Sequence, residues 1–386
     1  MLMKCWKNIV LISLLWVNCT YAAGPNDDIP SDTIALDEVE ITANRLLNFT
    51  TGSKIQRIPT TEIKTYNTSN LSELFSEITP MSIKSYGISG VSSVSLRGMS
   101  TKHTAVIWNG INLQSSMNGG VDMNSFPTFL IDEISIQHGG ESALFGSGAV
   151  GGIIHLNSAP SFNQGLDISY TQHIGSFNNF FEGVKFNYSN SKLASSTRIY
   201  HLASKNDFEF VNTQQFGTPT VKQENSAENK YGILQSNALK IGTNQKISIN
   251  IWAQSHYQEI PSMTTSSESE QNQNTDIVRL SAMYNINGKR SSWYSRFYYN
   301  YFAQVYKDPM LSLVSEMNTY TFLGELENKT ALGDHLILNT GLNYVNDRVN
   351  TPNYGLDRYR NKTALYSSLK FYNTQKTFTA IGSVRE

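Results

Sequence analysis

The sequence predicts a membrane β-barrel of antiparallel strands, preceded by a small α+β unit. After about residue 161, short segments present one apolar and one largely polar face, as the strands of outer-membrane barrels do. Tight polar turns alternate with longer polar connections between these segments. No apolar run after Val17 approaches the length of a membrane helix. In lipid, the backbone groups of such a chain would therefore be satisfied only in a barrel.

The alternation is clear in residues 278–285, where Val278 and Leu280 share one face while Arg279 and Ser281 share the other. Segments with the same pattern are residues 166–171, 247–252 and 336–344. Counted in this way, residues 161–386 contain about ten strands and the start of an eleventh.

The connections between these segments are alternately short and long. We expect tight turns near residues 190–192, 243–245, 287–289, 333–334 and 373–375. We expect long connections at residues 204–230, 258–275, 307–318 and 347–361, after a brief first loop at 176–179. A barrel with short periplasmic turns and long outer loops has this arrangement. A soluble β-sandwich has no reason to sort its loop lengths by side.

Residues 1–22 have the features of a secretory signal peptide. Lys4 and Lys7 form its basic end, and the apolar core that follows is too short to span a bilayer as a helix. Both cysteines, Cys5 and Cys19, lie in this segment, so the mature chain would contain no disulfide. Cleavage before Cys19, as in a lipoprotein, is the alternative. Removing the two lysines takes the formal net charge from −1 to −3, and neither value indicates nucleic-acid binding.

Residues 23–46 form a polar stretch that we expect to be mobile, with one short strand inside it. In that strand, Val39 and Ile41 lie on one side, while Glu38 and Glu40 lie on the other. A lone strand near a terminus is suited to adding to the sheet edge of a partner. The alternative is an ordinary first strand of the α+β unit.

We assign residues 47–160 to the α+β unit. Residues 70–79 predict a helix because Asn70 suits the N-cap and Glu73 stands at the capping-box position. We expect short strands at residues 94–96, 105–108, 131–136 and 153–156, a single turn at 142–145 and a loop at 82–93. The glycines of residues 139–152 predict a tightly packed backbone rather than a flexible linker.

The sequence contains no motif for catalysis, and we expect neither an enzyme nor a resident cofactor or metal. Residues 146–151 fit GxGxxG, but they run into a strand, whereas a dinucleotide site needs a helix there. The seven histidines form no metal-ligand motif, and no cysteine remains after processing to act as a nucleophile. The acids of residues 258–275 could bind calcium, but a solvated loop is the simpler interpretation because the ligand spacing is absent.

Three blocks carry a resemblance to a known family. They are SSVSLRGMSTKHTAVIWNGINL (residues 92–113), VDMNSFPTFLIDEI (121–134) and IDEISIQHGGESALFGSGAVGGIIHLN (131–157). In this order they resemble the plug domain of TonB-dependent outer-membrane receptors, and among these the cobalamin-receptor-like members. The resemblance implies a plug seated in a barrel of about 22 strands. Residues 161–386 would then be a truncated barrel, the first half of a longer product.

The resemblance implies an importer in the outer membrane of a Gram-negative bacterium, whose scarce, large ligand is cobalamin or an iron–siderophore chelate. It implies TonB, outer-membrane lipid and the small-molecule ligand as partners, with no nucleic acid. The segment similar to the TonB box of the family is Asp37, Glu38, Val39, Glu40, Ile41, Thr42 and Ala43. Ligand binding would release this segment into the periplasm, where TonB would pair with it and pull, driven by the proton gradient.

The resemblance also assigns roles within the plug. The residues implied in ligand binding, on two apical loops at 86–93 and 112–124, are Tyr86, Ser89, Ser92, Asn112, Gln114, Ser116 and Asn118. The residues implied in structure are Arg97, Gly98, Gly110, Gly139, Gly146, Gly151 and Gly152, with Arg97 buried and paired within the plug. Two other readings stay open: a passive porin or adhesin, and a glycan or peptide importer with a surface lipoprotein partner.

Overall fold

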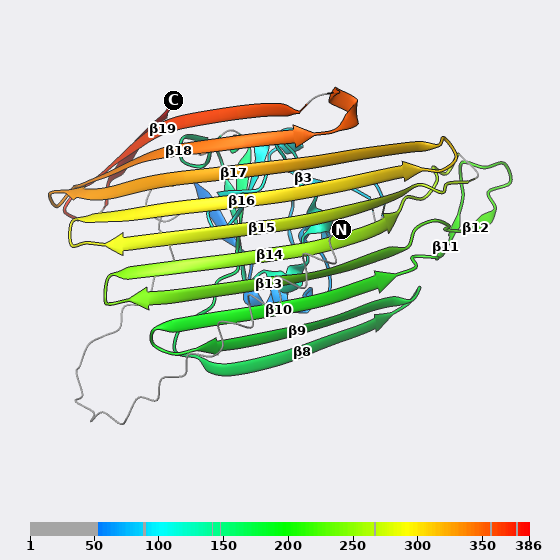
Figure 1. Cartoon of the computed structure of the whole chain (residues 1–386), viewed down its shortest axis with the longest axis horizontal. Coiled ribbons are helices and arrows are strands. Elements are labelled where there is room, and N and C mark those ends of the chain that lie inside the picture. The colour runs from blue at the N-terminus through cyan, green and yellow to red at the C-terminus, as the bar shows by residue number, and fades with distance from the viewer. Residues whose placement is uncertain are drawn as a thin grey trace. The chain divides into compact units, whose positions relative to one another are not determined.

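The structure contains two main β-sheets. The computed structural model describes residues 53–386 except residues 88–89, 141, 147, 266–267, 356 and 376. The larger sheet has eleven strands and the smaller one has five. We call the large sheet the wall, and the α+β unit around the small sheet the plug (Figure 1). The wall is a partial barrel, which confirms the predicted fold class. Among the described residues, no helix is long and apolar enough to cross a membrane.

The plug is built from short elements. Its strands are β1 (Lys54–Arg57), β2 (Ser82–Ser85), β3 (Ser92–Ser95), β4 (Thr104–Trp108), β5 (Ile111–Asn112), β6 (Glu133–His138) and β7 (Gly152–Asn157). Its helices are α3 (Thr60–Thr65), α4 (Leu71–Ile78) and α5 (Ser142–Phe145), with 3-10 turns η1 (Thr101–His103), η2 (Met123–Ser125) and η3 (Thr128–Leu130). The small sheet has the order β1-β6-β7-β4-β5, in which β4 and β7 run parallel and the other pairs run antiparallel.

Helix α4 confirms the helix predicted at residues 70–79. The side chain of Asn70 caps its N-terminus, because its Oδ1 accepts the Glu73 N–H at 3.0 Å. Leu74 and Phe75 face inward and are fully buried. The N-cap and the buried apolar face therefore both stabilise α4, because a helix this short is not stable without tertiary packing.

The glycine-rich segment connects β6 to β7, which pair antiparallel with Ile136 opposite Ile154. A Cβ atom on Gly152 would lie 2.5 Å from Leu96 Cδ1 and 2.7 Å from the carbonyl oxygen of Gln137. No side chain fits at such distances, so glycine is required there. The prediction of a closely packed backbone in this segment is confirmed.

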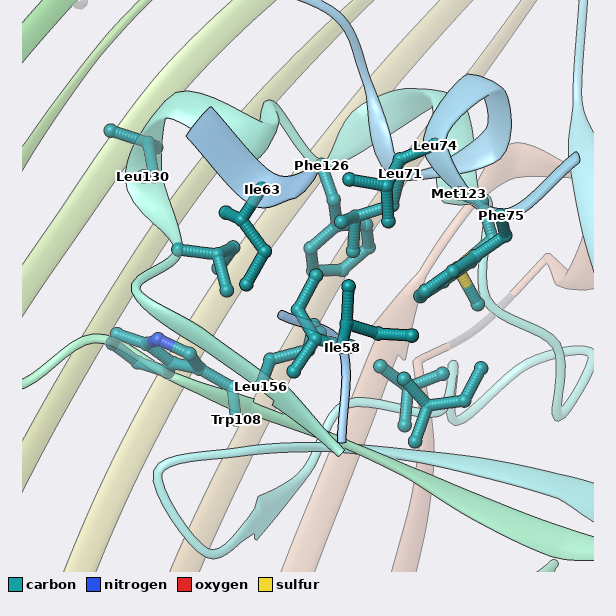
Figure 2. Close-up of a cluster of buried hydrophobic side chains, with 14 of the residues drawn as sticks. Ile58, Ile63, Leu71, Leu74, Phe75, Trp108, Met123, Phe126, Leu130 and Leu156 are labelled. Carbon is teal, nitrogen blue, oxygen red and sulfur yellow. The ribbon is translucent and has the colours of Figure 1, made fainter. Parts of the chain in front are cut away.

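The plug has an apolar core of its own, which Figure 2 shows. Ile63, Leu74 and Phe75 of the helices meet Trp108 and Leu156 of the small sheet, and all five side chains are buried. Full burial of one such side chain stabilises the folded state by about 1.5–3 kcal/mol. This core positions the short strands whose connecting loops form the site described below.

The wall follows the order of the chain. Its strands are β8 (Gly165–Gly175), β9 (Asn179–Ser189), β10 (Leu193–Ser204), β13 (Glu228–Ile241), β14 (Gln245–Glu259), β15 (Asn272–Asn287), β16 (Ser291–Asp308), β17 (Leu313–Leu332), β18 (Leu336–Asn350), β19 (Arg358–Tyr372) and β20 (Thr379–Arg385). Each strand pairs antiparallel with the next one in this series (Figure 1). The count of ten strands and a beginning eleventh is confirmed, since β20 has 7 residues.

The long connections, after β10, β14 and β18, all leave from the same end of the wall strands, as predicted, although β16 and β17 are joined at that end by residues 309–312 alone. The long connection after β10 contains a hairpin of β11 (Glu209–Val211) and β12 (Thr220–Lys222). The one after β18 contains the 3-10 turn η4 (Pro352–Tyr354). We call the end of the wall that carries the long connections the outer end.

Some of the segments predicted as loops are partly strand, and two of them differ in ways that matter for the plug and the outer end. Residues 82–93 include β2, which pairs with β3 as a hairpin. Within residues 307–318, β16 and β17 keep pairing as far as Asp308 opposite Leu313, so only residues 309–312 turn. Polar and small residues hide the two-residue period in both segments, and backbone pairing does not require apolar side chains.

The two faces of the wall differ as the alternation predicted. On β10, Tyr200 is 3% exposed while Ile199 is 51% exposed. On β14, Trp252 is buried while Ile249 is exposed. The buried face contacts the plug, since the rings of Trp108 and Trp252 lie 5.2 Å apart.

Candidate functional site

Two loops of the plug, one between β2 and β3 and one after β5, lie together in the structure. The Asp122 Oδ1 accepts the Ser92 N–H at 2.8 Å and the Asn124 N–H at 3.1 Å. The Asn124 side-chain amide donates to the Gly90 carbonyl at 2.5 Å. The two apical loops that the sequence singled out are therefore brought together, and Asp122 is the residue that joins them.

The Asp122 carboxyl lies between these loops, and the residue is half-buried. Burial raises its pKa, while the two backbone hydrogen bonds and the positive charge of Lys230 oppose that rise. The carboxylate accepts two backbone N–H groups, which is the usual compensation for a buried charge. Sequence reasoning missed Asp122, although an Asp two residues before Asn124 at a 3-10 start is a recognisable turn signal.

The loop after β5 is stiffened by its own side chains. The Gln114 amide nitrogen donates to the Lys102 carbonyl at 2.9 Å and to the Gly119 carbonyl at 3.1 Å. The Asn112 amide donates to the Gln114 Oε1 at 3.1 Å, and the Asn118 Oδ1 accepts the N–H of the second residue after it. Much of the hydrogen-bonding capacity of Asn112 and Gln114 is therefore used within the loop.

The ligand-facing residues expected from sequence differ in exposure. Tyr86 is 63% exposed, and the Lys84 ammonium lies 5.0 Å from its ring centroid. Asn118 is exposed as well. Ser92 is fully buried, with its hydroxyl hydrogen-bonded to that of Ser72 at 2.5 Å. Ser89 lies outside the described residues, as does the TonB-box-like segment.

Three wall side chains hold the backbone of these loops. The Lys230 ammonium of β13 donates to the Asn124 carbonyl at 3.4 Å. The Gln254 amide of β14 donates to the Ser125 carbonyl at 2.9 Å. The Arg360 guanidinium of β19 donates to the carbonyl of Ser116 at 3.0 Å. All three lie toward the outer end of their strands, so the paired loops of the plug are attached to the outer end of the wall.

The charged groups beside these loops are paired. Lys230 and Glu228 form an ion pair at 2.8 Å, and both side chains are buried. Arg360 and Asp347 form another at 2.8 Å. His256 lies 3.7 Å from the Glu228 carboxylate. With these wall charges compensated, the loops present uncharged hydrogen-bonding groups, the Tyr86 ring and the exposed Lys84 ammonium beside that ring.

The plug and the wall also meet through an ion pair whose arginine is buried, and through contacts between aromatic rings. Arg198 of β10 donates to the Leu130 carbonyl at 2.9 Å and to the carboxylate of Asp132. The Phe129 and Phe181 rings lie 5.5 Å apart in an edge-to-face arrangement. Such contacts combine apolar burial with directional bonds, so the plug has a defined seat on the wall.

The expectation that Arg97 is buried is wrong. Its side chain is exposed, and its guanidinium donates to the His138 carbonyl at 3.4 Å, so it is paired within the plug but at the surface. The reason is local, because residue 97 follows β3 in a turn with a φ of 55° that directs the side chain outward. The expected structural glycines with positive φ are Gly98, Gly110, Gly139 and Gly146.

The remaining two glycines of that set, Gly151 and Gly152, have neighbouring atoms within 3.1 Å and 2.5 Å of a built Cβ. Among the described residues, no group of three or more His, Cys, Asp or Glu side chains could hold a metal ion.

Comparison with known proteins finds relatives of the plug and of the fold. Residues 48–153 match the model of the TonB-dependent receptor plug domain. The chain is 32% identical over 131 residues to the vitamin B12 transporter BtuB of Vibrio vulnificus, a match that covers 33% of this chain and 21% of that protein. A match to BtuB of Photobacterium profundum is 27% identical over 138 residues, covering 34% of this chain and 23% of that protein.

Solved structures share the fold. The FrpB iron transporter of Neisseria meningitidis superposes with a TM-score of 0.72 at 14% identity, covering 88% of this chain and 58% of that one. The siderophore receptor PiuA of Acinetobacter baumannii superposes with a TM-score of 0.61 at 12% identity, covering 88% of this chain and 61% of that one. The chain thus spans less than two thirds of the length of these relatives.

The matched proteins are transporters and receptors rather than enzymes. Their plug is found here in sequence, and their fold in the plug and partial barrel of the structure. The chain therefore resembles TonB-dependent receptors in residues 48–153, which match their plug domain, and it shares its fold with the FrpB iron transporter.

Proposed function

We propose that this protein imports a corrinoid of the vitamin B12 type across the outer membrane of a Gram-negative bacterium. The observation that carries the proposal is the pair of plug loops joined by Asp122 and attached to the outer end of the wall by Lys230, Gln254 and Arg360. A ligand held on these loops would contact plug and wall together. Ligand binding would then change the contacts between the plug and the wall, as coupling between distant sites requires.

The chemistry of the loops supports a large polar ligand without a fixed charge. The acids and bases on the wall beside the loops, Lys230 with Glu228 and Arg360 with Asp347, are paired with each other, which leaves amide and hydroxyl groups for direct hydrogen bonds. Tyr86 adds an exposed ring that can pack against a flat ligand surface. We propose Tyr86, Ser116 and Asn118 as ligand-facing residues, and we leave Ser92 out of that set because its hydroxyl is buried.

We further propose that TonB pairs with residues 37–43 and pulls, using the proton gradient of the inner membrane. Backbone pairing predicts that a proline within this strand is severe, because it removes a donor from the ladder. Val39→Pro should abolish uptake of radiolabelled cyanocobalamin by cells while leaving its binding to isolated outer membranes unchanged. Normal uptake by this variant would contradict strand pairing.

Growth of a strain that lacks the gene tests the ligand. On limiting cobalamin, we expect the deletion strain to grow poorly and the native gene to restore growth. On limiting iron, we expect deletion and parent to grow alike. A defect confined to limiting iron would instead assign the receptor to an iron chelate. Growth at the parental rate under both conditions would contradict import of either ligand.

A further inference from the structure

Arg279 of β15 is a buried cation at the boundary between plug and wall. It is 6% exposed and faces the plug. Its guanidinium carbon lies 4.4 Å from the ring centroid of Trp252, on the wall, and 5.2 Å from that of Phe126, on the plug. Trp252 in turn contacts both Phe126 and Trp108 edge-to-face (Figure 2 shows the two plug residues).

The polar partners of Arg279 are few. The Tyr298 hydroxyl lies within hydrogen-bonding reach of the guanidinium. The Nη1 has no hydrogen-bond partner, and no carboxylate of the described residues lies within ion-pair distance. The other two buried arginines of the wall differ, since Arg198 is paired with Asp132 and Arg296 with two glutamates. Arg279 is therefore held mainly by aromatic faces.

The solvation free energy of the Arg279 guanidinium depends on whether the plug is seated against the wall. Taking a guanidinium out of water is costly, and cation–π contacts with an incomplete set of hydrogen bonds recover only part of that cost. Phe126 covers one side of the cation, and it belongs to the plug. If the plug moved away from the wall, water could reach Arg279 and restore its hydration. The seated plug therefore bears a cost that the displaced plug does not.

We propose that Arg279 is a positioning residue for transport, which makes the plug easier to displace from the wall. This inference rests on the proposed function, since it takes plug displacement to be part of import. Arg279 acts through the seat of Phe126 and Trp252 and has no contact with the site of ligand capture proposed above.

Hydrogen–deuterium exchange of the purified receptor, made from its full native gene, tests the proposal without any ligand. In Arg279→Met, a side chain of similar length fills the same space without a charge, so the plug should seat more firmly. We expect amides of residues 123–130 to exchange about tenfold more slowly, which corresponds to about 1.4 kcal/mol. Arg279→Lys keeps the charge and should stay close to the parent. Exchange in Arg279→Met as fast as in the parent, or faster, would overturn the proposal.

A matched control is Arg296→Met, which leaves the carboxylates of Glu325 and Glu327 buried without their cation. Both glutamates lie on β17, so exchange should become faster in β16 and β17 and should not slow in residues 123–130. A second variant, Phe126→Leu, keeps Arg279 but removes one aromatic face. Its exchange should be faster than that of the parent, and this increase should shrink in the Arg279→Met background because the two side chains are coupled. Equal effects of Phe126→Leu in both backgrounds would contradict the role of Arg279.

Uptake measurements link the exchange result to transport. In cells that carry Arg279→Met, the initial rate of radiolabelled cyanocobalamin uptake should fall several-fold while the Kd for cyanocobalamin stays unchanged. Uptake at the parental rate would overturn the proposed role. If the parent protein bound no cyanocobalamin, the proposed ligand would be wrong, and the exchange measurement would still decide whether Arg279 weakens the seat of the plug.

Discussion

The plug and the wall are stabilised in different ways. The plug encloses a core of its own, in which Leu71, Leu74 and Phe75 are fully buried. The largest buried apolar side chains of the wall, Trp252 and Phe181, lie against the plug. Neighbouring strands of the wall follow one another along the chain, whereas the small sheet also joins strands far apart in sequence, β1 with β6 and β4 with β7. Loss of packing should therefore damage the plug far more than the outward face of the wall.

Phe75→Ala provides the strongest test of this difference. Phe75 is fully buried in α4, and a Phe-to-Ala change in a core costs about 3–5 kcal/mol through lost transfer energy and the remaining cavity. We expect amide exchange throughout the plug to rise by more than two orders of magnitude. Leu365→Ala, on the exposed face of β19, is the control and should change exchange in the plug little. Similar effects of the two variants would remove the distinction between plug and wall.

Gly183→Val tests whether the wall is shaped to receive the plug. A Cβ atom on Gly183 of β9 would lie 2.6 Å from Phe129 Cζ, so a side chain there must push Phe129 away. Overpacking of this kind costs about 1–3 kcal/mol. Gly324→Val is the matched control, because nothing lies within 4 Å of its built Cβ. We expect only Gly183→Val to increase tryptic cleavage of the plug in detergent, and equal cleavage in both would show that the seat tolerates a larger side chain.

His155 should make the plug sensitive to acid. Burial in β7 lowers the pKa of His155 to about 3, so the imidazole stays neutral beside Gln137. The unfolded chain takes up a proton below about pH 6.5, so this contribution to stability is present above that pH and is lost as the pH falls toward 3. At pH 5 we expect a loss of about 2 kcal/mol relative to pH 7.

Thermal unfolding of the parent and of His155→Gln, followed from pH 7 to pH 5, measures this loss as a difference between the two proteins. Asp122, whose pKa is raised, contributes in the opposite direction and is present in both, so it cancels in the comparison. Parallel curves for the parent and the variant would show that His155 does not cause the acid sensitivity.

Asn70→Ala should have the smallest effect. It removes the side-chain acceptor for the Glu73 N–H at the start of α4, and loss of an N-cap costs about 1 kcal/mol. We expect exchange to rise in α4 by about fivefold and to stay unchanged in β16 and β17. Asn70→Ser, which restores an acceptor, should recover most of the protection. An Asn70→Ala protein with parental exchange in α4 would show that packing alone sustains the helix.

The candidate site was only partly predictable. The two apical loops were proposed from the resemblance to the receptor plug, and the structure brings them together through Asp122. Lys230, Gln254 and Arg360 could not be singled out, because the inward face of the wall carries many polar residues and the sequence does not say which of them meet the plug. The burial of Arg97 was predicted wrongly because a single φ at a turn decides it.

The sequence by itself determined the secondary structure of the wall, the number of its strands and the side on which its long connections lie. These features depend on a two-residue period and on turn chemistry, both of which are local. It also determined α4, through its cap and its apolar spacing. The seat of the plug was decided only by tertiary structure, because it joins residues such as Phe126 and Arg279 that are far apart in the chain. Whether a buried charge there is paired or covered by rings depends on which side chains meet in three dimensions.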